Sequence, residues 1–127
     1  MIDKENEIFN AVAKRLREKF PKIYVVGTEL VSAQSYFPAV SFVQTNNAIS
    51  GQYSTFESLE NVVKEDYKAE VYSNLTKGKE AQTKEITAVI SDVMCEFNYE
   101  RTFCEPIPNA DAAIHRRVSR YTNKNVI

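Results

Sequence analysis

The sequence has few of the residues from which catalytic and metal sites are usually built. Its 127 residues include three glycines, two cysteines and one histidine. Because the glycines form no glycine-rich stretch, a phosphate-binding loop of the Walker or dinucleotide type is excluded. A structural zinc ion usually takes four Cys or His ligands, whereas this chain has three such residues in all, and Cys95 lies nine positions before Cys104. The sequence therefore predicts no metal site.

Long apolar runs and a strong net charge are also missing. No apolar stretch approaches the roughly 18 residues of a membrane-spanning helix, and the charged residues 1–7 contain no signal-peptide core. The formal net charge is −1, so the molecule as a whole does not attract nucleic acid or an anionic membrane. We expect a protein that is made and used in a cytoplasm, with no membrane partner and with both cysteines as free thiols.

What the sequence does contain is a succession of helical and strand patterns. Apolar residues spaced three and four apart predict amphipathic helices over 4–20 and 79–97. Short apolar or alternating segments predict strands at 23–26, 39–44, 62–73, 99–105 and about 113–121. The order α-β-β-β-α-β-β predicts a single α+β domain over 1–127. In it, two helices pack on one face of a mostly antiparallel sheet of about five strands.

Residues 46–60 form a long polar stretch between two of the predicted strands. Loops of this length in a compact domain tend to be functional or mobile. Tyr53 and Phe56 are large aromatic residues within it. They either pack back onto the core or contact a partner, and the sequence leaves both alternatives open.

The one pair of residues that could form a nucleophilic site is Cys104 with His115. Such a pair also needs an orienting group and an oxyanion cradle, and the sequence shows neither. Cys95 lies beside the apolar stripe of the second predicted helix, where a cysteine usually acts as a small apolar residue. We therefore expect no enzyme and assign no catalytic residue.

A stronger signal is the concentration of arginine near the C-terminal end. Between residues 101 and 124, five basic residues stand against two acidic ones, and Tyr99, Phe103 and Tyr121 are interleaved with them. The basic residues are Arg101, Arg116, Arg117, Arg120 and Lys124. A basic sheet face that carries aromatic residues can bind single-stranded nucleic acid.

The alternative is that these arginines pair with acids on neighbouring strands or subunits. Acids outnumber lysines between residues 57 and 70, and Glu65, Asp66 and Glu70 belong to this acidic stretch. Arginine binds carboxylates bidentately, so an acidic and a basic stretch on one domain suit head-to-tail self-association into a ring. The last predicted strand has no cleanly apolar face, which is typical of a strand at an edge or a subunit interface.

A set of short motifs runs along most of the chain. They are F-P-K-I-Y-V at 20–25, F-P-A-V-S-F at 37–42, V-Y-S-N-L-T-K-G-K at 71–79, R-T-F-C-E-P-I-P-N at 101–109, D-A-A-I-H-R-R at 111–117 and R-Y at 120–121. Together, with a long helix between the third and the fourth, they resemble the tail terminator or tail completion proteins. These small proteins are encoded in the tail-assembly gene clusters of tailed phages and prophages.

The resemblance implies an α/β or α+β fold that assembles into a ring, usually a hexamer, on the head-proximal end of the tail tube. Such a ring stops tube growth and offers a surface to the head connector, with no cofactor and no chemistry. The implied partners are other copies of the chain, the tail tube protein and the head–tail connector protein. Genomic DNA passes through the lumen without specific binding. The implied location is the virion, after assembly in the host bacterial cytoplasm.

The resemblance also implies a set of contact residues that would join subunits or line the lumen. The 46–60 loop would contact the tube or the connector. A head–tail joining, or neck, protein is the alternative within the same biology. A nucleic-acid-binding module with an arginine-rich sheet face is the alternative from another class. The candidate interface residues are Arg101, Arg116, Arg117, Arg120, Tyr121, Glu65, Asp66, Glu70, Tyr53 and Phe56.

Overall fold

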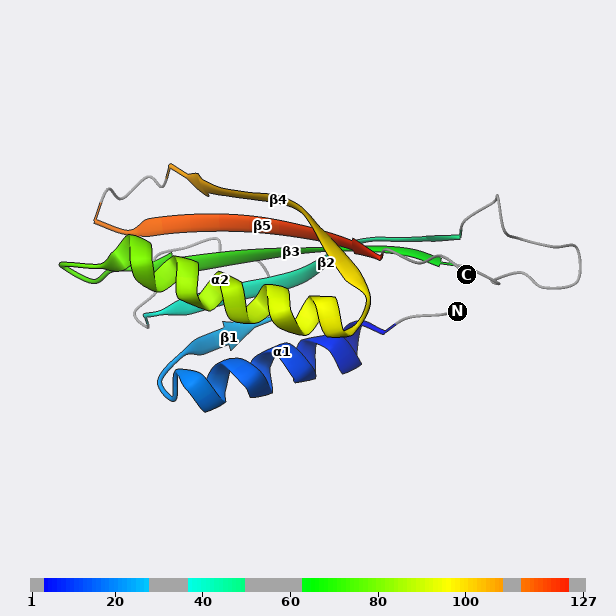
Figure 1. Cartoon of the computed structure of the whole chain (residues 1–127), viewed down its shortest axis with the longest axis horizontal. Helices are drawn as coiled ribbons and strands as arrows, with labels where there is room; N and C mark the ends of the chain where they lie inside the picture. The colour runs from blue at the N-terminus through cyan, green and yellow to red at the C-terminus, as the bar shows by residue number, and fades with distance from the viewer. Residues whose placement is uncertain (1–3, 28–36, 50–62, 109–112, 124–127) are drawn as a thin grey trace, which may run out of the picture.

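The computed structural model describes residues 4–27, 37–49, 63–108 and 113–123 (Figure 1). Its elements follow the predicted order α-β-β-β-α-β-β. They are α1 (Glu5–Lys19), β1 (Tyr24–Val26), β2 (Ala39–Ile49), β3 (Val63–Ser73), α2 (Lys79–Glu96), β4 (Tyr99–Ile107) and β5 (His115–Asn123). The predicted α+β class is therefore confirmed.

The five strands form one sheet in the order β1-β2-β3-β5-β4. β1 runs parallel to β2, and the other three pairings are antiparallel. The sheet is therefore mixed, as one parallel pair accompanies the antiparallel majority that the sequence predicts. β1 and β4 are its two edges, and they lie on opposite sides of the molecule (Figure 1).

Both helices cover the same face of the sheet (Figure 1). α1 buries Ile8, Val12 and Leu16, and α2 buries Ile86 and Ile90 among other residues of its stripe. These side chains meet an aromatic and aliphatic layer from the strands, in which the ring of Phe42 stacks on that of Tyr67 at a centroid distance of 5.3 Å. Since burial of apolar area is the main favourable term in folding, the predicted helical stripes determine which sheet face is covered.

β2 is longer than its sequence pattern predicts. The pattern ends at residue 44, but the strand continues to Ile49, and Asn46 pairs with Asp66 of β3 after an irregularity in register. Residues 46–49 therefore belong to a strand and not to the loop expected at 46–60. This segment is polar and lacks the apolar alternation on which strand prediction rests. It is a strand because its backbone pairs with β3.

The position of β5 corrects a second expectation. The polar character of this strand favoured an edge or interface position, yet it lies between β3 and β4 inside the sheet. Val118, Ser119 and Tyr121 are all buried. Hydrogen bonds and ion pairs within the subunit satisfy part of its polar surface, so burial did not require one fully apolar face.

Candidate functional site

Glu70 is the centre of an ion-pair cluster on the sheet face away from the helices. Its Oε1 lies 2.8 Å from Nη2 of Arg116 and 3.3 Å from Nζ of Lys68, and the hydroxyl of Tyr72 donates to its Oε2 over 2.6 Å. Arg116 also lies over the Tyr72 ring, 6.0 Å from the centroid. We call these four residues the Glu70 cluster. Because β3 and β5 are adjacent, the sheet register brings them together.

The cluster holds Glu70 in its charged form. Burial alone would raise the pKa of this carboxyl, but the hydrogen bonds from Tyr72 and Arg116 and the charges of Arg116 and Lys68 outweigh it. The pKa of Glu70 is consequently lowered from its ordinary value of 4.5. Burial, followed by the hydrogen bond to Glu70, raises the pKa of the Tyr72 hydroxyl well above its ordinary value. The hydroxyl is therefore a donor at any physiological pH.

Glu65 lies at the centre of a second buried network, on the face covered by the helices. Its Oε1 accepts hydrogen bonds from the backbone N–H of Lys4 at 3.2 Å, from Gln44 at 3.0 Å and from the Tyr67 hydroxyl at 3.2 Å. Its Oε2 accepts one from Tyr99 at 3.2 Å. Lys4 is the N-cap of α1 and has no side-chain cap of its own. A carboxylate from β3 therefore satisfies a backbone donor at the positive end of this helix.

These two networks change the role assigned to the acidic stretch. Glu65 and Glu70 are 3% and 5% exposed, so both are interior residues rather than contact residues for another subunit. Asp66 is half-buried and accepts a hydrogen bond from the side chain of Asn46 at 3.2 Å. The acidic and basic stretches thus meet first within one subunit, because β3 and β5 pair, and Glu70 takes Arg116 as its partner.

The arginines predicted to form one surface lie on different faces. Arg116 and Arg120 point away from the helices, whereas Arg117 alternates to the helix side and is 7% exposed. Its Nη1 lies 3.8 Å from Sγ of Cys104. Arg101 is exposed, and its Nη1 donates to the hydroxyl of Ser91 on α2 over 3.3 Å.

Two of the three aromatic residues interleaved with these arginines are buried and cannot stack with bases. Tyr99 and Tyr121 are 5% and 2% exposed and belong to the core. The hydroxyl of Tyr121 lies 2.9 Å from that of Ser91. Tyr121 is therefore an interior residue rather than an interface residue. Phe103 is half-buried and pairs with Arg120, so the described part of β4 and β5 offers one aromatic side chain beside the outward-facing arginines rather than a row of them.

The register also separates the one candidate nucleophilic pair. Cys104 pairs with Ser119, which lies four residues beyond His115 on β5. At about 3.3 Å per residue, this offset corresponds to roughly 13 Å along the strand. Cys95 is exposed, which corrects the expectation that it is a small apolar residue beside the buried stripe of α2. Met94 belongs to the buried stripe, and Cys95, the next residue, points outward.

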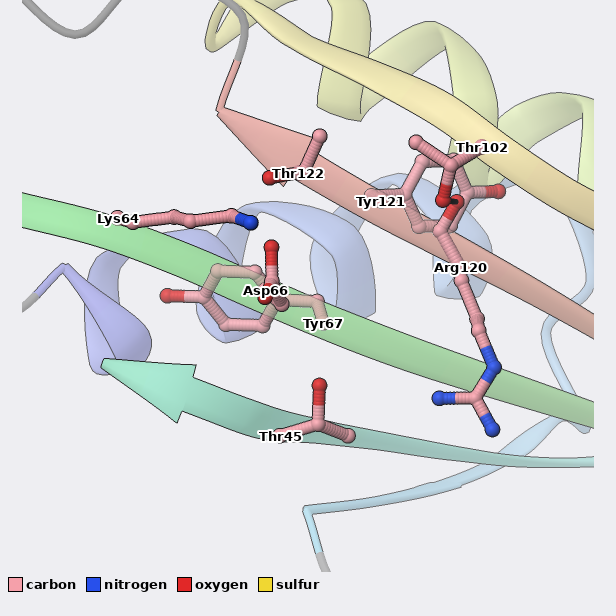
Figure 2. Close-up of a pocket in the computed structure, with 8 residues that line it drawn as sticks. All are labelled: Thr45, Lys64, Asp66, Tyr67, Thr102, Arg120, Tyr121 and Thr122. Atoms are coloured by element: carbon pink, nitrogen blue, oxygen red, sulfur yellow. Dashed lines mark hydrogen bonds between the residues drawn. The ribbon is translucent and has the colours of Figure 1, made fainter. Parts of the chain in front are cut away.

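A hollow of about 250 Å³ lies on the sheet face away from the helices (Figure 2). Its lining residues are Thr45, Lys64, Asp66, Tyr67, Thr102, Arg120, Tyr121 and Thr122. Figure 2 shows Asp66 between Lys64 and Arg120, with the threonines around them. Thr45 and Thr102 lie at the two register irregularities of the sheet. With two cations and one carboxylate, the hollow is suited to a small anionic group.

A second pocket, of about 340 Å³, lies where α1 turns into β1. Its lining residues are Lys19, Phe20, Pro21, Lys22, Ile23, Pro38 and Gln82. We call it the corner pocket. Its floor is mainly apolar, and two lysines stand at its rim. Sequence reasoning missed both pockets, because the hollow depends on register irregularities and the corner pocket on the approach of segments that are distant in the chain.

Two candidate contact residues, Tyr53 and Phe56, lie outside the described residues, as does the 50–60 part of the predicted loop. In the described ranges, no group of three or more His, Cys, Asp or Glu side chains could hold a metal ion. None of the described helices is long and apolar enough to cross a membrane. No family model matches the chain, and no curated protein matches it.

Proposed function

We propose that this protein is a structural virion component that forms a ring on the head-proximal end of a phage tail tube. The ring ends tube growth and provides the surface to which the head attaches. The proposal starts from the tail-terminator-like motifs. The structure supports it by gathering V-Y-S at 71–73, E-P-I at 105–107 and R-R at 116–117 on three adjacent strands, at one end of the sheet.

The observation that carries the proposal is the pair of sheet edges on opposite sides of the subunit. β4 is a nine-residue edge strand, most of it exposed or half-buried, and β1 is the opposite edge. An exposed edge strand favours association with another chain. When two different surfaces of one subunit meet in neighbouring copies, the contact is heterologous and generates a ring if the rotation closes.

The proposed partners follow from such a ring. Copies of the chain meet side by side, one end of the ring contacts the tail tube protein, and the other contacts the head–tail connector protein. Genomic DNA passes through the lumen. A net charge of −1 gives the molecule little overall attraction for that DNA, which suits a passage rather than a binding site. The role requires no cofactor and no catalytic step.

The test is the mass of the purified protein by light scattering over a wide range of concentrations, followed by incubation with tail tubes that lack their terminator. We expect a ring-sized species either in solution or on the tube end, and tubes of uniform length when the protein is present. A protein that remains monomeric in both settings, and leaves tube length unchanged, would contradict the proposal.

The hollow favours a second candidate, a nucleic-acid-binding module with phosphate contacts at Lys64 and Arg120. Reversal of one charge, Arg120→Glu, separates the two functions. Arg120 is exposed, so the fold should tolerate the change. If the hollow binds nucleic acid, retention of single-stranded DNA falls while the mass of the protein is unchanged. If the protein is a ring component only, the variant and the wild type bind DNA equally weakly.

A further inference from the structure

The sheet register places one part of each edge strand at the same level. Tyr24 of β1 pairs with Ala39, which pairs with Tyr72 of β3. Tyr72 pairs with Arg116, and Arg116 pairs with Ile107 of β4. These five residues form a single row across the sheet. The start of β1 and the end of β4 therefore lie opposite each other, at the same end of the strands (Figure 1).

The β1 end of this row is next to the corner pocket. Ile23, immediately before β1, lines the pocket together with Phe20 and Pro21. Lys19 and Lys22 are exposed at its rim. Beside it, Tyr24 is 38% exposed, one of two large apolar side chains that the described residues leave exposed. This corner offers an apolar floor with two positive charges.

The β4 end of the row has the complementary chemistry. Residues 105–108 read Glu-Pro-Ile-Pro, and Glu105, Pro106 and Pro108 are exposed while Ile107 is half-buried. An acid is thus followed by three apolar residues. Proline fixes φ and restricts the residue before it, so the segment has little conformational freedom to lose on binding.

We propose that residues 105–108 of one copy dock into the corner pocket of the next copy, with Glu105 between Lys19 and Lys22. This inference rests on the proposed ring and specifies its contact. The two surfaces differ, so the contact is heterologous. Because they lie at one level along the strands, a neighbour is reached without a shift along the strand direction. Such an operation closes into a ring when the rotation axis runs along the strands and the rotation divides a full turn.

The first test joins the two surfaces covalently. In a background with Cys95→Ser and Cys104→Ser, Lys22→Cys and Glu105→Cys are introduced together, and the protein is oxidised under mild conditions. A disulfide requires Cα atoms within about 7 Å of each other. We expect a ladder of covalent oligomers up to the size of the ring, whereas each single cysteine variant gives dimers at most. Lys14→Cys with Glu105→Cys is the matched control, since Lys14 is also exposed on α1 but does not line the pocket.

The second test uses the native cysteines and exchanges the charges. Glu105→Lys alone and the pair Lys19→Glu, Lys22→Glu should each raise the concentration needed for half-assembly by about tenfold. The combination of all three changes should restore assembly. Glu100→Lys, another exposed acid on β4, is the control and should leave assembly unchanged.

The outcomes separate this contact from the proposed function. If the wild type forms rings, but the cysteine pair gives no ladder and the charge exchanges leave assembly unchanged, the docking contact is wrong and the ring remains. If the wild type forms no ring either alone or on tail tubes, the proposed function and the contact both fail. A ladder together with charge-swap rescue establishes the contact.

Discussion

Glu70 takes part in two ion pairs of the sheet, one with Arg116 and one with Lys68. Arg116, Lys68 and the Tyr72 hydroxyl all converge on its carboxylate, whose side chain is 7% exposed. Removing one member of a buried ion pair leaves the other charge without compensation. We therefore expect Glu70→Ala to lower the free energy of unfolding by about 3 kcal/mol, measured by urea denaturation.

The control for this prediction is Glu100→Ala. Glu100 is an exposed acid on β4, and surface substitutions usually change stability by less than about 0.5 kcal/mol. Similar effects of the two substitutions would show that the Glu70 cluster is not a stabilising unit.

The carboxylate of Glu70 also makes the free energy of unfolding depend on pH, with lower stability in acid. The pKa of Glu70 is lowered in the folded state from its ordinary value of 4.5. Its contribution to the free energy of unfolding is therefore fully present above pH 4.5. That contribution is lost as the pH falls through the lower pKa that Glu70 has in the folded state. We expect the stability difference between the wild type and Glu70→Gln to shrink when unfolding is measured below pH 4.5 rather than at pH 7. A difference that stays constant over this range would contradict the assignment.

At the scale of elements, two left-handed residues bracket α2. Gly78 precedes it with φ of 80°, and Asn98 follows its C-cap with φ of 66°. A Cβ built on Gly78 would have no atom within 4 Å, so Gly78→Ala tests backbone conformation alone. We expect it to lower the free energy of unfolding by about 1 kcal/mol, seen as a lower Tm.

Gly27→Ala is the matched control for the backbone argument. Gly27 has no positive φ, and its Cβ would make ordinary contact with the Phe9 ring at 3.5 Å. The substitution should leave the Tm unchanged or raise it slightly, because alanine restricts the unfolded chain. If both variants lose stability equally, the left-handed conformation of Gly78 is not the cause.

The elements also show how far the sequence determines the fold. Both helices could be predicted, since the stripes of α1 and α2 are regular and α2 ends where Asn98 turns the chain. The length of β2 and the internal position of β5 could not, because they depend on pairing between distant segments. The sequence predicts that Arg116 pairs with an acid, but it does not predict that this acid is Glu70 of the same chain. That choice follows from the order of the strands.

At the scale of the whole molecule, the proposed contact predicts a salt dependence. Glu105 would lie between two lysines at an exposed rim, and exposed charges are screened over about 8 Å at physiological ionic strength. We expect the concentration for half-assembly to rise between about 50 mM and 500 mM NaCl, as measured by light scattering. The apolar floor of the corner pocket should keep part of the assembly at high salt. Complete insensitivity to salt would argue against the Glu105 contact.

Leu75 would offer a stronger contact surface in a closed assembly than in a single subunit. It is 42% exposed between β3 and α2, at the end of β3 where Tyr72 pairs with Ala39, the neighbour of Pro38 in the corner pocket. One leucine on one subunit offers a weak contact. Rotational symmetry would repeat it at equal intervals around one rim, so that a partner of matching symmetry would engage every copy at once. Avidity then turns a contact too weak to hold a monomer into one that holds a ring.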